Sequence, residues 1–212
     1  MWQNYFDAIF ILSLDHCKTT NLRLPQIMPV LKEKGINAQV FDSHFDIDGA
    51  HGCYSTHMEL FNLCLESGLK NILVFEDDIK FVNTPGVDFD KVMTEALAAC
   101  AGPGFPYHTL HLGPNTHTPL HWSHNNLLLM DQCLSTHAQA YSRDAMEQIV
   151  NYEWDGTPID KMIEQKLQPQ RRCYCTFPLL VTQQNGYSDI EKRTVNMYYI
   201  EERFAQNTKH IF

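Results

Sequence analysis

The stretch KNILVFEDDIKF, residues 70–81, joins an apolar run directly to three consecutive acids. Its apolar part is typical of a central strand that is covered on both faces of a parallel sheet. Glu76, Asp77 and Asp78 follow, and neighbouring carboxylates repel one another and are costly to desolvate at the end of a buried strand. The stretch therefore predicts a buried strand that ends at a site where a positive group neutralises the acids.

Strand and helix patterns alternate around this stretch. Gly35 is a plausible end for the first helix, and Thr56 and Glu59 have the spacing of a capping box, which predicts a helix start at Thr56. The alternation predicts an α/β fold with a mostly parallel central sheet and helices on both faces, and ligands gather at the carboxyl ends of such strands. The expected strands are 8–14, 37–43 and 71–79, and the other expected helices lie at 22–34 and 88–100 and within 138–152 and 157–167.

Residues 101–126 differ in composition from the rest of the chain. They are rich in Gly, Pro, His and Asn, and only YHTLHL (107–112) resembles a strand. This composition predicts a long, loop-dominated segment of the kind that often carries function. His121 and His124 lack further ligands at zinc-site spacing, and Trp122 either stacks on a bound ligand or packs in the core.

Length and charge limit the possible functions. The 212 residues fit a single domain, 1–212, and 16 basic against 25 acidic residues give a formal charge of −9. This charge argues against nucleic acid or an anionic membrane as the main partner. No stretch approaches the roughly 20 apolar residues of a membrane span, and no signal peptide is apparent. The seven scattered cysteines indicate reduced, mostly buried thiols and an intracellular, cytoplasmic location.

The three acids suggest a cation site. Side chains alternate along a strand, so Glu76 and Asp78 are expected on one side and Asp77 on the other. Two carboxylates at this spacing can hold one hard cation, Mg²⁺ or Mn²⁺, that bridges the phosphates of a nucleotide. The alternative is a strand-to-loop junction at which the acids stay hydrated.

Asp42, after the preceding strand, lies in an acidic turn or contacts a ribose or base.

Five segments, taken in chain order, match the motifs of one known family. They are FILSLDHCKTTNLR (10–23), GCYSTHMELFNLCLESGLKNILVFEDDI (52–79), AYSRDAMEQIV (140–150), TPIDKMI (157–163) and FPLLVTQQNGYSDIE (177–191). Together they resemble glycosyltransferase family 25, the lipooligosaccharide and procollagen galactosyltransferase type. Ser13 stands where the family usually has Asn, Thr56 where it has Ser, and Asp144 where it has Gly, and these departures bear on the identity of the sugars.

The resemblance implies a GT-A-like fold and a nucleotide-diphospho sugar donor, with a UDP-sugar favoured. It also implies Mn²⁺ (or Mg²⁺) held by an Asp-x-Asp-like motif, and inverting transfer of a hexosyl group to a glycan or glycoprotein. Residues 1–100 would form the half that binds the donor, and 101–212 the acceptor side. Similar domains occur in large DNA viruses that glycosylate their own capsids, which makes the host cytoplasm an alternative location.

Carried over by position, the resemblance assigns Glu76 and Asp78 to the metal, with Asp77 as a supporting charge near the donor. His111, at the end of 107–112, is a candidate third metal ligand. His57 is expected to donate a hydrogen bond to the donor sugar or the diphosphate. The full set of candidate donor-binding residues is Ser13, Leu14, Arg23, Asp42, Thr56, His57 and Asp77.

An inverting transfer needs a base for the acceptor hydroxyl. Asp160 is the candidate, although an acid at a helix start also interacts favourably with the helix dipole. Asp189 is the rival base or an acceptor-binding residue. Two other functions remain open: a metal-dependent nucleotidyltransferase, which would need a basic triphosphate loop that is not apparent, and a non-catalytic carbohydrate-binding or scaffold relative, which has no physical need for mutually repelling acids.

Overall fold

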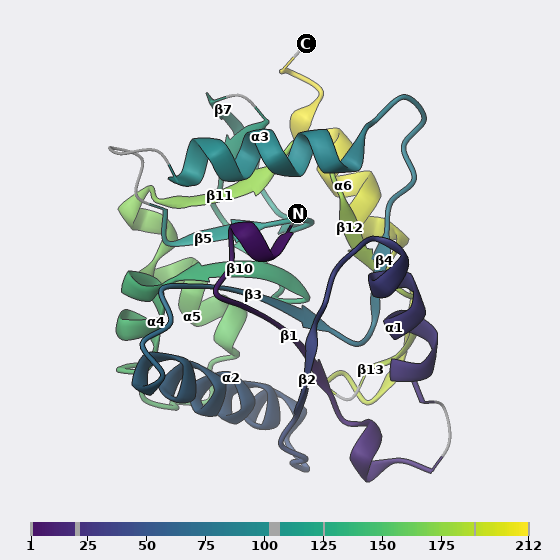
Figure 1. The fold of residues 1–212 in the computed structure, drawn as a ribbon, viewed down its shortest axis with the longest axis vertical. Coiled ribbons are helices and arrows are strands. Elements are labelled where there is room, and N and C mark those ends of the chain that lie inside the picture. The colour runs from purple at the N-terminus through teal and green to yellow at the C-terminus, as the bar shows by residue number, and fades with distance from the viewer. Residues whose placement is uncertain (1, 20–21, 102–106, 125, 189, 212) are drawn as a thin grey trace.

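The computed structural model describes residues 2–19, 22–101, 107–124, 126–188 and 190–211. The described chain forms one large central sheet with helices around it (Figure 1). β10 and β8 run opposite to the other strands of this sheet, which is therefore mixed but mostly parallel, as the sequence predicts. In spatial order its strands are β2 (Gln39–Asp42), β1 (Ala8–Ser13), β3 (Asn71–Glu76), β10 (Ala138–Ser142), β5 (Thr109–His111), β11 (Cys173–Thr176), β8 (Leu127–Leu129) and β7 (His121–His124).

Side chains of the central strands alternate between two cores, one on each face of the sheet. Leu73 and Phe75 of β3 share a core with α1 and α3, whereas Ile72 and Val74 share the other core with α2, α4 and α5. Burial on both faces explains why β3 is almost wholly apolar. The helices are α1 (Leu24–Glu33), α2 (Gly49–Glu66), α3 (Phe89–Ala101), α4 (Arg143–Ile149), α5 (Ile159–Lys166) and α6 (Tyr198–Thr208).

Short elements complete the described chain. Two of the short strand pairs, β12 with β4 and β13 with β14, bring residues after 180 back toward the end of β3. The remaining elements are η1 (Trp2–Asn4), η2 (Asp15–Cys17), η3 (Gln168–Gln170), β4 (Ile79–Phe81), β6 (Asn115–Thr116), β9 (Cys133–Leu134), β12 (Val181–Gln183), β13 (Gly186–Ser188) and β14 (Arg193–Val195).

The segment expected to be mostly loop contains more strand than its composition predicts. Its described part holds β5, β6 and β7, and β7 pairs with β8 to extend the sheet. Trp122 lies on this outer strand and is 54% exposed, with its ring centroid 6.4 Å from that of Phe177. These residues have no periodic apolar pattern, but they still form a strand at the edge of the sheet, because the hydrogen bonds between paired strands come from the backbone.

Helix α2 begins earlier than the sequence predicts. Asp48 caps it, and its carboxylate accepts hydrogen bonds from the backbone of Ala50 and His51. Thr56 lies inside the helix instead, where its hydroxyl donates to the Gly52 carbonyl at 2.8 Å. The predicted capping box at Thr56 is therefore wrong, because this hydroxyl bonds to the preceding helical turn.

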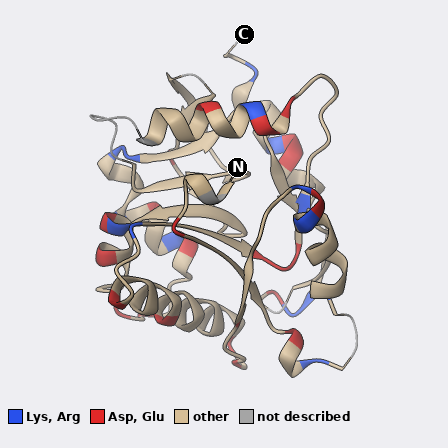
Figure 2. Cartoon of the chain, viewed as in Figure 1, with Lys and Arg blue, Asp and Glu red and all other residues tan. Residues whose placement is uncertain are grey.

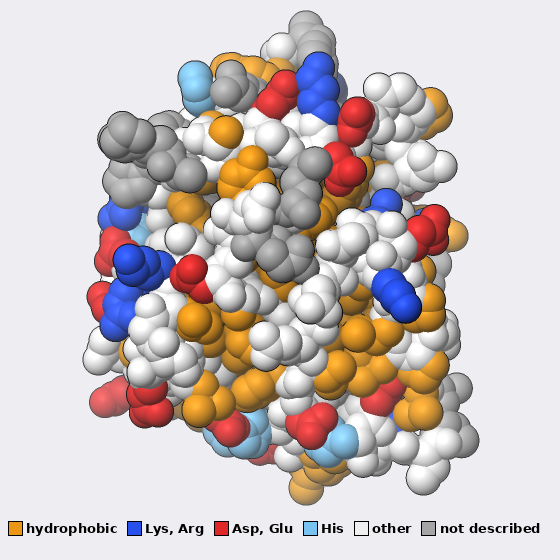
Figure 3. Space-filling view, viewed as in Figure 1, with side chains coloured by type: hydrophobic (Ala, Val, Ile, Leu, Met, Phe, Trp, Pro, Cys, Tyr) orange, Lys and Arg blue, Asp and Glu red, His pale blue; other side chains and the backbone are white. Residues whose placement is uncertain are grey.

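The thiols lie mostly in the interior of the protein. All seven cysteines are free, and most of them are buried. Among the helices that the structure describes, none is long and apolar enough to cross a membrane. Lys and Arg side chains are interspersed with Asp and Glu on the face drawn in Figure 3.

Three buried histidines predict how stability depends on pH. Burial lowers the pKa of His57 and His137 to about 4 and that of His111 to about 3. As the pH falls below about 6.5, the unfolded chain protonates these histidines while the folded protein does not. Each histidine therefore removes up to about 1.4 kcal/mol of stability per pH unit between about pH 6.5 and its folded pKa.

We expect His111→Gln to reduce this slope by about 1.4 kcal/mol per pH unit. Urea unfolding at pH 6.5, 5.5 and 4.5 measures it, and comparison with the wild type cancels the opposing contribution of buried carboxylates. An unchanged slope would contradict a neutral His111 in the folded core.

Candidate functional site

A cleft opens at the carboxyl ends of β1 and β3, where the acids of the sequence lie. The acidic turn after β3 is the red segment at the end of that strand in Figure 2. The cleft has a volume of about 150 Å³. Its walls are the ends of β1 and β3, the loop before α2 with the first turns of that helix, and the segment 183–197. Residues assigned to both halves of the chain thus line one cleft.

Most of the candidate donor- and metal-binding residues are brought together here. Those that line the cleft are Ser13, Leu14, Arg23, Thr56, His57, Glu76, Asp77 and Asp78. Asp42 is not among them, because its side chain is 71% exposed and faces His16, with His16 Nδ1 3.5 Å from Asp42 Oδ1. Ser43, the next residue, lines the cleft instead.

Arg23 is the positive group that the acids require. Strand β3 ends at Glu76, and Asp77 and Asp78 form a turn that leads into β4, so the expected single strand through residue 79 is interrupted. Arg23 Nη1 lies 3.0 Å from Asp77 Oδ1 and 3.8 Å from Asp78 Oδ2. The same guanidinium donates to the Tyr187 carbonyl at 2.6 Å.

Asp77 belongs to a closed ring of hydrogen bonds. The Ser13 hydroxyl donates to Asp77 Oδ2 at 2.5 Å and accepts from the backbone N–H of Asp15 at 3.0 Å. Asp15 Oδ2 in turn accepts from the backbone of Arg23 at 2.8 Å, and the Arg23 side chain closes the ring at Asp77. Both Asp77 oxygens are thus bonded inside the protein, and the carboxylate acts as an anchor.

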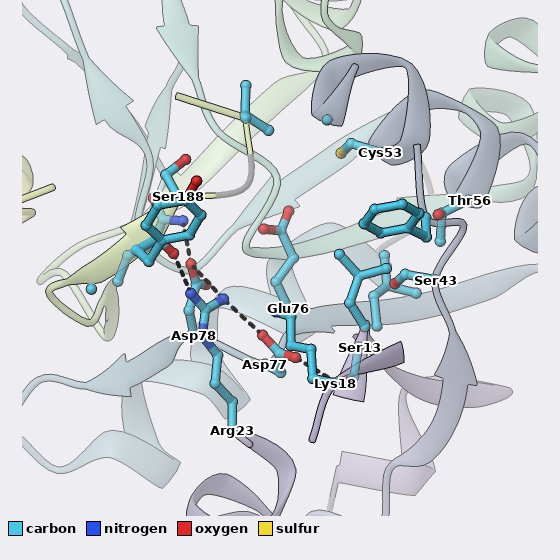
Figure 4. A pocket seen from close by; sticks show the side chains of 18 of the residues that line it. Ser13, Lys18, Arg23, Ser43, Cys53, Thr56, Glu76, Asp77, Asp78 and Ser188 are labelled. Atoms are coloured by element: carbon cyan, nitrogen blue, oxygen red, sulfur yellow. Dashed lines mark hydrogen bonds and ion pairs between the residues drawn. The ribbon is translucent and has the colours of Figure 1, made fainter. Parts of the chain in front are cut away.

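Glu76 and Asp78 keep unused oxygen capacity. Glu76 Oε1 accepts from the Thr136 hydroxyl at 2.7 Å, and Asp78 Oδ2 accepts from the Gln183 amide at 3.2 Å. Asp78 Oδ1 is buried without a hydrogen-bond partner among the described residues. In Figure 4 the Glu76 side chain stands between Ser188 on one side and Cys53 on the other.

The electrostatics of this pair favour a cation. Burial, followed by repulsion from Asp78, raises the pKa of Glu76. Burial also raises the pKa of Asp78, although Arg23 opposes the shift. Carboxylates that are costly to ionise in the empty cleft gain most when a positive ligand arrives. Oxygen donors of this kind fit a hard divalent cation, and the orphaned Asp78 oxygen supplies a place for one.

The geometry does not bring His111 to Glu76 and Asp78. His111 lies on β5, separated from β3 by β10, and its register partner on β10 pairs with Val74 rather than with the end of β3. It is buried, and the nearby His137 adds to the lowering of its pKa. Within the described residues no cluster of three or more His, Cys, Asp and Glu side chains could by itself hold a metal ion.

Thr56 and His57 line the cleft, but the Thr56 hydroxyl and His57 Nδ1 are hydrogen-bonded inside the protein, and only His57 Nε2 lacks a partner among the described residues. The Thr56 hydroxyl also accepts from the backbone of His44 at 2.8 Å, which fixes the loop before α2. His57 Nδ1 lies 2.9 Å from the Cys53 carbonyl, which can only accept, so this nitrogen carries the proton. The other ring nitrogen of neutral His57 is then an acceptor, which differs from the donor role expected from the sequence.

Asp160 lies at the start of α5 and is connected to Glu76 by a short turn. Asp160 Oδ2 accepts from the backbone of Ser135 at 3.0 Å, and the next residue, Thr136, donates to Glu76. Asp160 is close enough to contribute to the raised pKa of Glu76. The rival candidate, Asp189, lies outside the described residues.

Sequence reasoning missed several residues that line the cleft or support its acids. Thr136, which donates to Glu76, gave no signal because it precedes β10, some 60 residues from its partner. Gln183 lines the cleft, and its amide donates to Asp78 Oδ2 at 3.2 Å. Large apolar side chains also line the cleft and are at least half exposed: Phe45, Tyr187 and Ile190.

The mostly parallel sheet and the acids at the end of its central strand define an α/β domain with a ligand cleft at the carboxyl ends of its strands. A model of glycosyltransferase family 25 (LPS biosynthesis protein) matches residues 47–152, half of the chain. The chain belongs to this family.

Solved structures show a similar fold at low sequence identity. The crystal structure of A197 from STIV has a TM-score of 0.53 and 13% identity, covering 90% of this chain and 93% of that one. A glycosyltransferase involved in glycosylation of the major capsid of PBCV-1 has a TM-score of 0.46 and 12% identity, over 94% and 99%. The Drosophila β1,4-galactosyltransferase 7 mutant with manganese, UDP-Gal and xylobiose has a TM-score of 0.43 and 12% identity, over 96% of this chain and 78% of that one. No curated protein sequence matches significantly.

Proposed function

We propose that this protein is a metal-dependent, inverting hexosyltransferase that moves a sugar from a nucleotide-diphospho sugar, with UDP-sugar favoured, to a glycan or glycoprotein. The proposal rests on a difference in hydrogen bonding among the three acids. Asp77 is fully bonded, whereas Glu76 and Asp78 face the same cleft with oxygen lone pairs to spare. A pair of partly buried acids at a strand end suits a bridging cation and a diphosphate.

Glu76 and Asp78 would hold Mn²⁺ or Mg²⁺, and the remaining ligands would come from the diphosphate and water. Such sites commonly use one or two carboxylates together with substrate phosphates. When bound, the cation would neutralise negative charge that develops on the departing diphosphate. Lys18 and Lys192 also line the cleft and are positioned to contribute positive charge toward the diphosphate.

The apolar rim of the cleft suits the planar parts of the substrates. Phe45 is 68% exposed and Tyr187 is 51% exposed, although both line the cleft. Exposed apolar groups at a binding site commonly mark ligand contacts. We assign them to the ring faces of the donor nucleotide or of the sugars, while the polar groups deeper in the cleft hold the diphosphate.

Asp160 would act as the base. As the acceptor oxygen bonds to the anomeric carbon, the proton of the acceptor hydroxyl passes to Asp160. The bond from the anomeric carbon to the diphosphate oxygen breaks at the same time, and the electron pair of that bond leaves with the diphosphate. The turn at Ser135 and Thr136 holds Asp160 and Glu76 at a fixed separation, since it bonds to both. The acceptor would thus approach from the side of α5, in the second half of a single domain.

A melting screen tests the donor and the metal. UDP-, GDP- and dTDP-sugars are added with and without Mn²⁺, and we expect a UDP-sugar with Mn²⁺ to raise the melting temperature by several degrees. Ligand at 100 times its Kd stabilises by about 2.7 kcal/mol. A shift with one nucleotide class fixes the donor, whereas no shift with any donor would favour a scaffold function and contradict the proposal.

A further inference from the structure

We propose that Arg23 is a built-in counter-ion that couples binding of the divalent cation to binding of the diphosphate. The inference rests on the proposed function, because it concerns the same cleft. In the ligand-free protein Arg23 takes the place of a cation beside the acids. Each ligand alone therefore binds with lower affinity than it does when the other ligand is bound.

The position of Arg23 carries this inference. Its guanidinium lies 3.0 Å from Asp77 Oδ1 and 3.8 Å from Asp78 Oδ2, the residue with the orphaned buried oxygen. The side chain of Arg23 is only 26% exposed, and those of Asp77 and Asp78 are 7% and 17% exposed. Water therefore screens the charges less than it would at an open surface.

Arg23 is also held in place from its backbone. The N–H groups of Arg23 and Leu24, at the start of α1, both donate to Asp15 Oδ2 at 2.8 Å. The tip of the side chain is fixed by the Tyr187 carbonyl at 2.6 Å, on the far wall of the cleft. Figure 4 shows the guanidinium between Asp77 and the segment that carries Ser188. The positive charge consequently cannot move far from the acids.

Charge arithmetic gives the direction of the coupling. Glu76, Asp77 and Asp78 carry three formal negative charges when ionised, and Arg23 offsets one of them. The guanidinium repels a dication that approaches Asp78 and attracts a diphosphate that approaches the same place. A diphosphate bound next to the dication removes that repulsion, so each ligand should raise the affinity for the other by the same factor.

Calorimetric titration of the full chain tests the coupling without measuring turnover. The probes are Mn²⁺ alone, and UDP and GDP in parallel with saturating Mn²⁺. We expect Arg23→Met to bind Mn²⁺ alone about tenfold more tightly and the nucleotide diphosphate about tenfold more weakly. Opposite changes in the affinities for Mn²⁺ and for the nucleotide diphosphate would identify the coupling, because loss of a merely structural role would weaken the binding of both ligands.

Three further variants separate charge from structure. Arg23→Lys keeps the charge and should stay near the wild type in Mn²⁺ affinity. The double variant Arg23→Met with Asp77→Asn restores the net charge and should return Mn²⁺ affinity to within about threefold of the wild type. Lys32→Met removes a positive charge from an exposed position of the same helix and should change neither affinity.

The outcomes that overturn the inference are distinct. Weaker Mn²⁺ binding by Arg23→Met, or unchanged Mn²⁺ binding, overturns it while leaving the proposed function in place. A wild type that binds neither Mn²⁺ nor a nucleotide diphosphate overturns the proposed function and this inference together.

Discussion

Asp78→Asn is expected to abolish the manganese-dependent part of donor binding and to lower kcat/KM by about 10²–10³-fold, an order typical of losing one electrostatic contact to developing charge. The substitution keeps the shape of the side chain and removes the charge beside the orphaned oxygen. Burial already raises the pKa of Asp78, so neutralising it should leave the ligand-free protein as stable as the wild type, or more stable.

Melting curves with and without Mn²⁺ and UDP-sugar measure this effect. Asp46→Asn is the matched control, since Asp46 also lines the cleft but bonds to His51 at 2.7 Å. The control should keep the manganese-dependent shift. If Asp78→Asn kept it as well, Asp78 would not be a metal ligand.

Asp160→Asn is expected to lower kcat by about 10²–10⁴-fold, the usual contribution of a positioned general base. Binding of the donor and of Mn²⁺ should change little, because the Asp160 carboxylate bonds to the backbone of Ser135 and Lys161 and is not one of the two acids assigned to the cation. The amide oxygen of Asn can still accept from the Ser135 backbone, so the turn that connects Asp160 to Glu76 should persist.

Steady-state kinetics with varied donor and acceptor measure this prediction. Glu164→Gln, one turn further along α5, is the control and should retain most of the wild-type kcat. Retention of kcat by Asp160→Asn would reject Asp160 as the base, and it would direct attention to Asp189. An equal loss of donor affinity would indicate a role in binding instead.

Much of the fold follows from local sequence patterns. The apolar run of β3 predicts a strand buried on both faces, and Leu73 and Val74 do lie in opposite cores. The acids at its end predict a ligand site because they need a positive partner. Asp48 before Gly49 also carried a recognisable helix-start signal, although the spacing of Thr56 and Glu59 pointed elsewhere.

The partners of the acids could not be predicted in the same way. Ser13 and Arg23 contact Asp77 across 64 and 54 residues, and Thr136 reaches Glu76 across 60. Such contacts depend on strand order, and the sequence pattern does not reveal that the antiparallel β10 lies between β3 and β5. The same inserted strand separates His111 on β5 from the end of β3, which the sequence pattern does not reveal either.

The contacts made by β12 and the residues after it have a consequence for the order in which the cleft forms during synthesis. Gln183 contacts Asp78 across 105 residues, and the Tyr187 carbonyl contacts Arg23 across 164. A ribosome therefore synthesises the acids of the cleft long before it synthesises the groups that hold them in place. The cleft can acquire its final shape only after β12 and β13 have been synthesised and β12 has paired with β4.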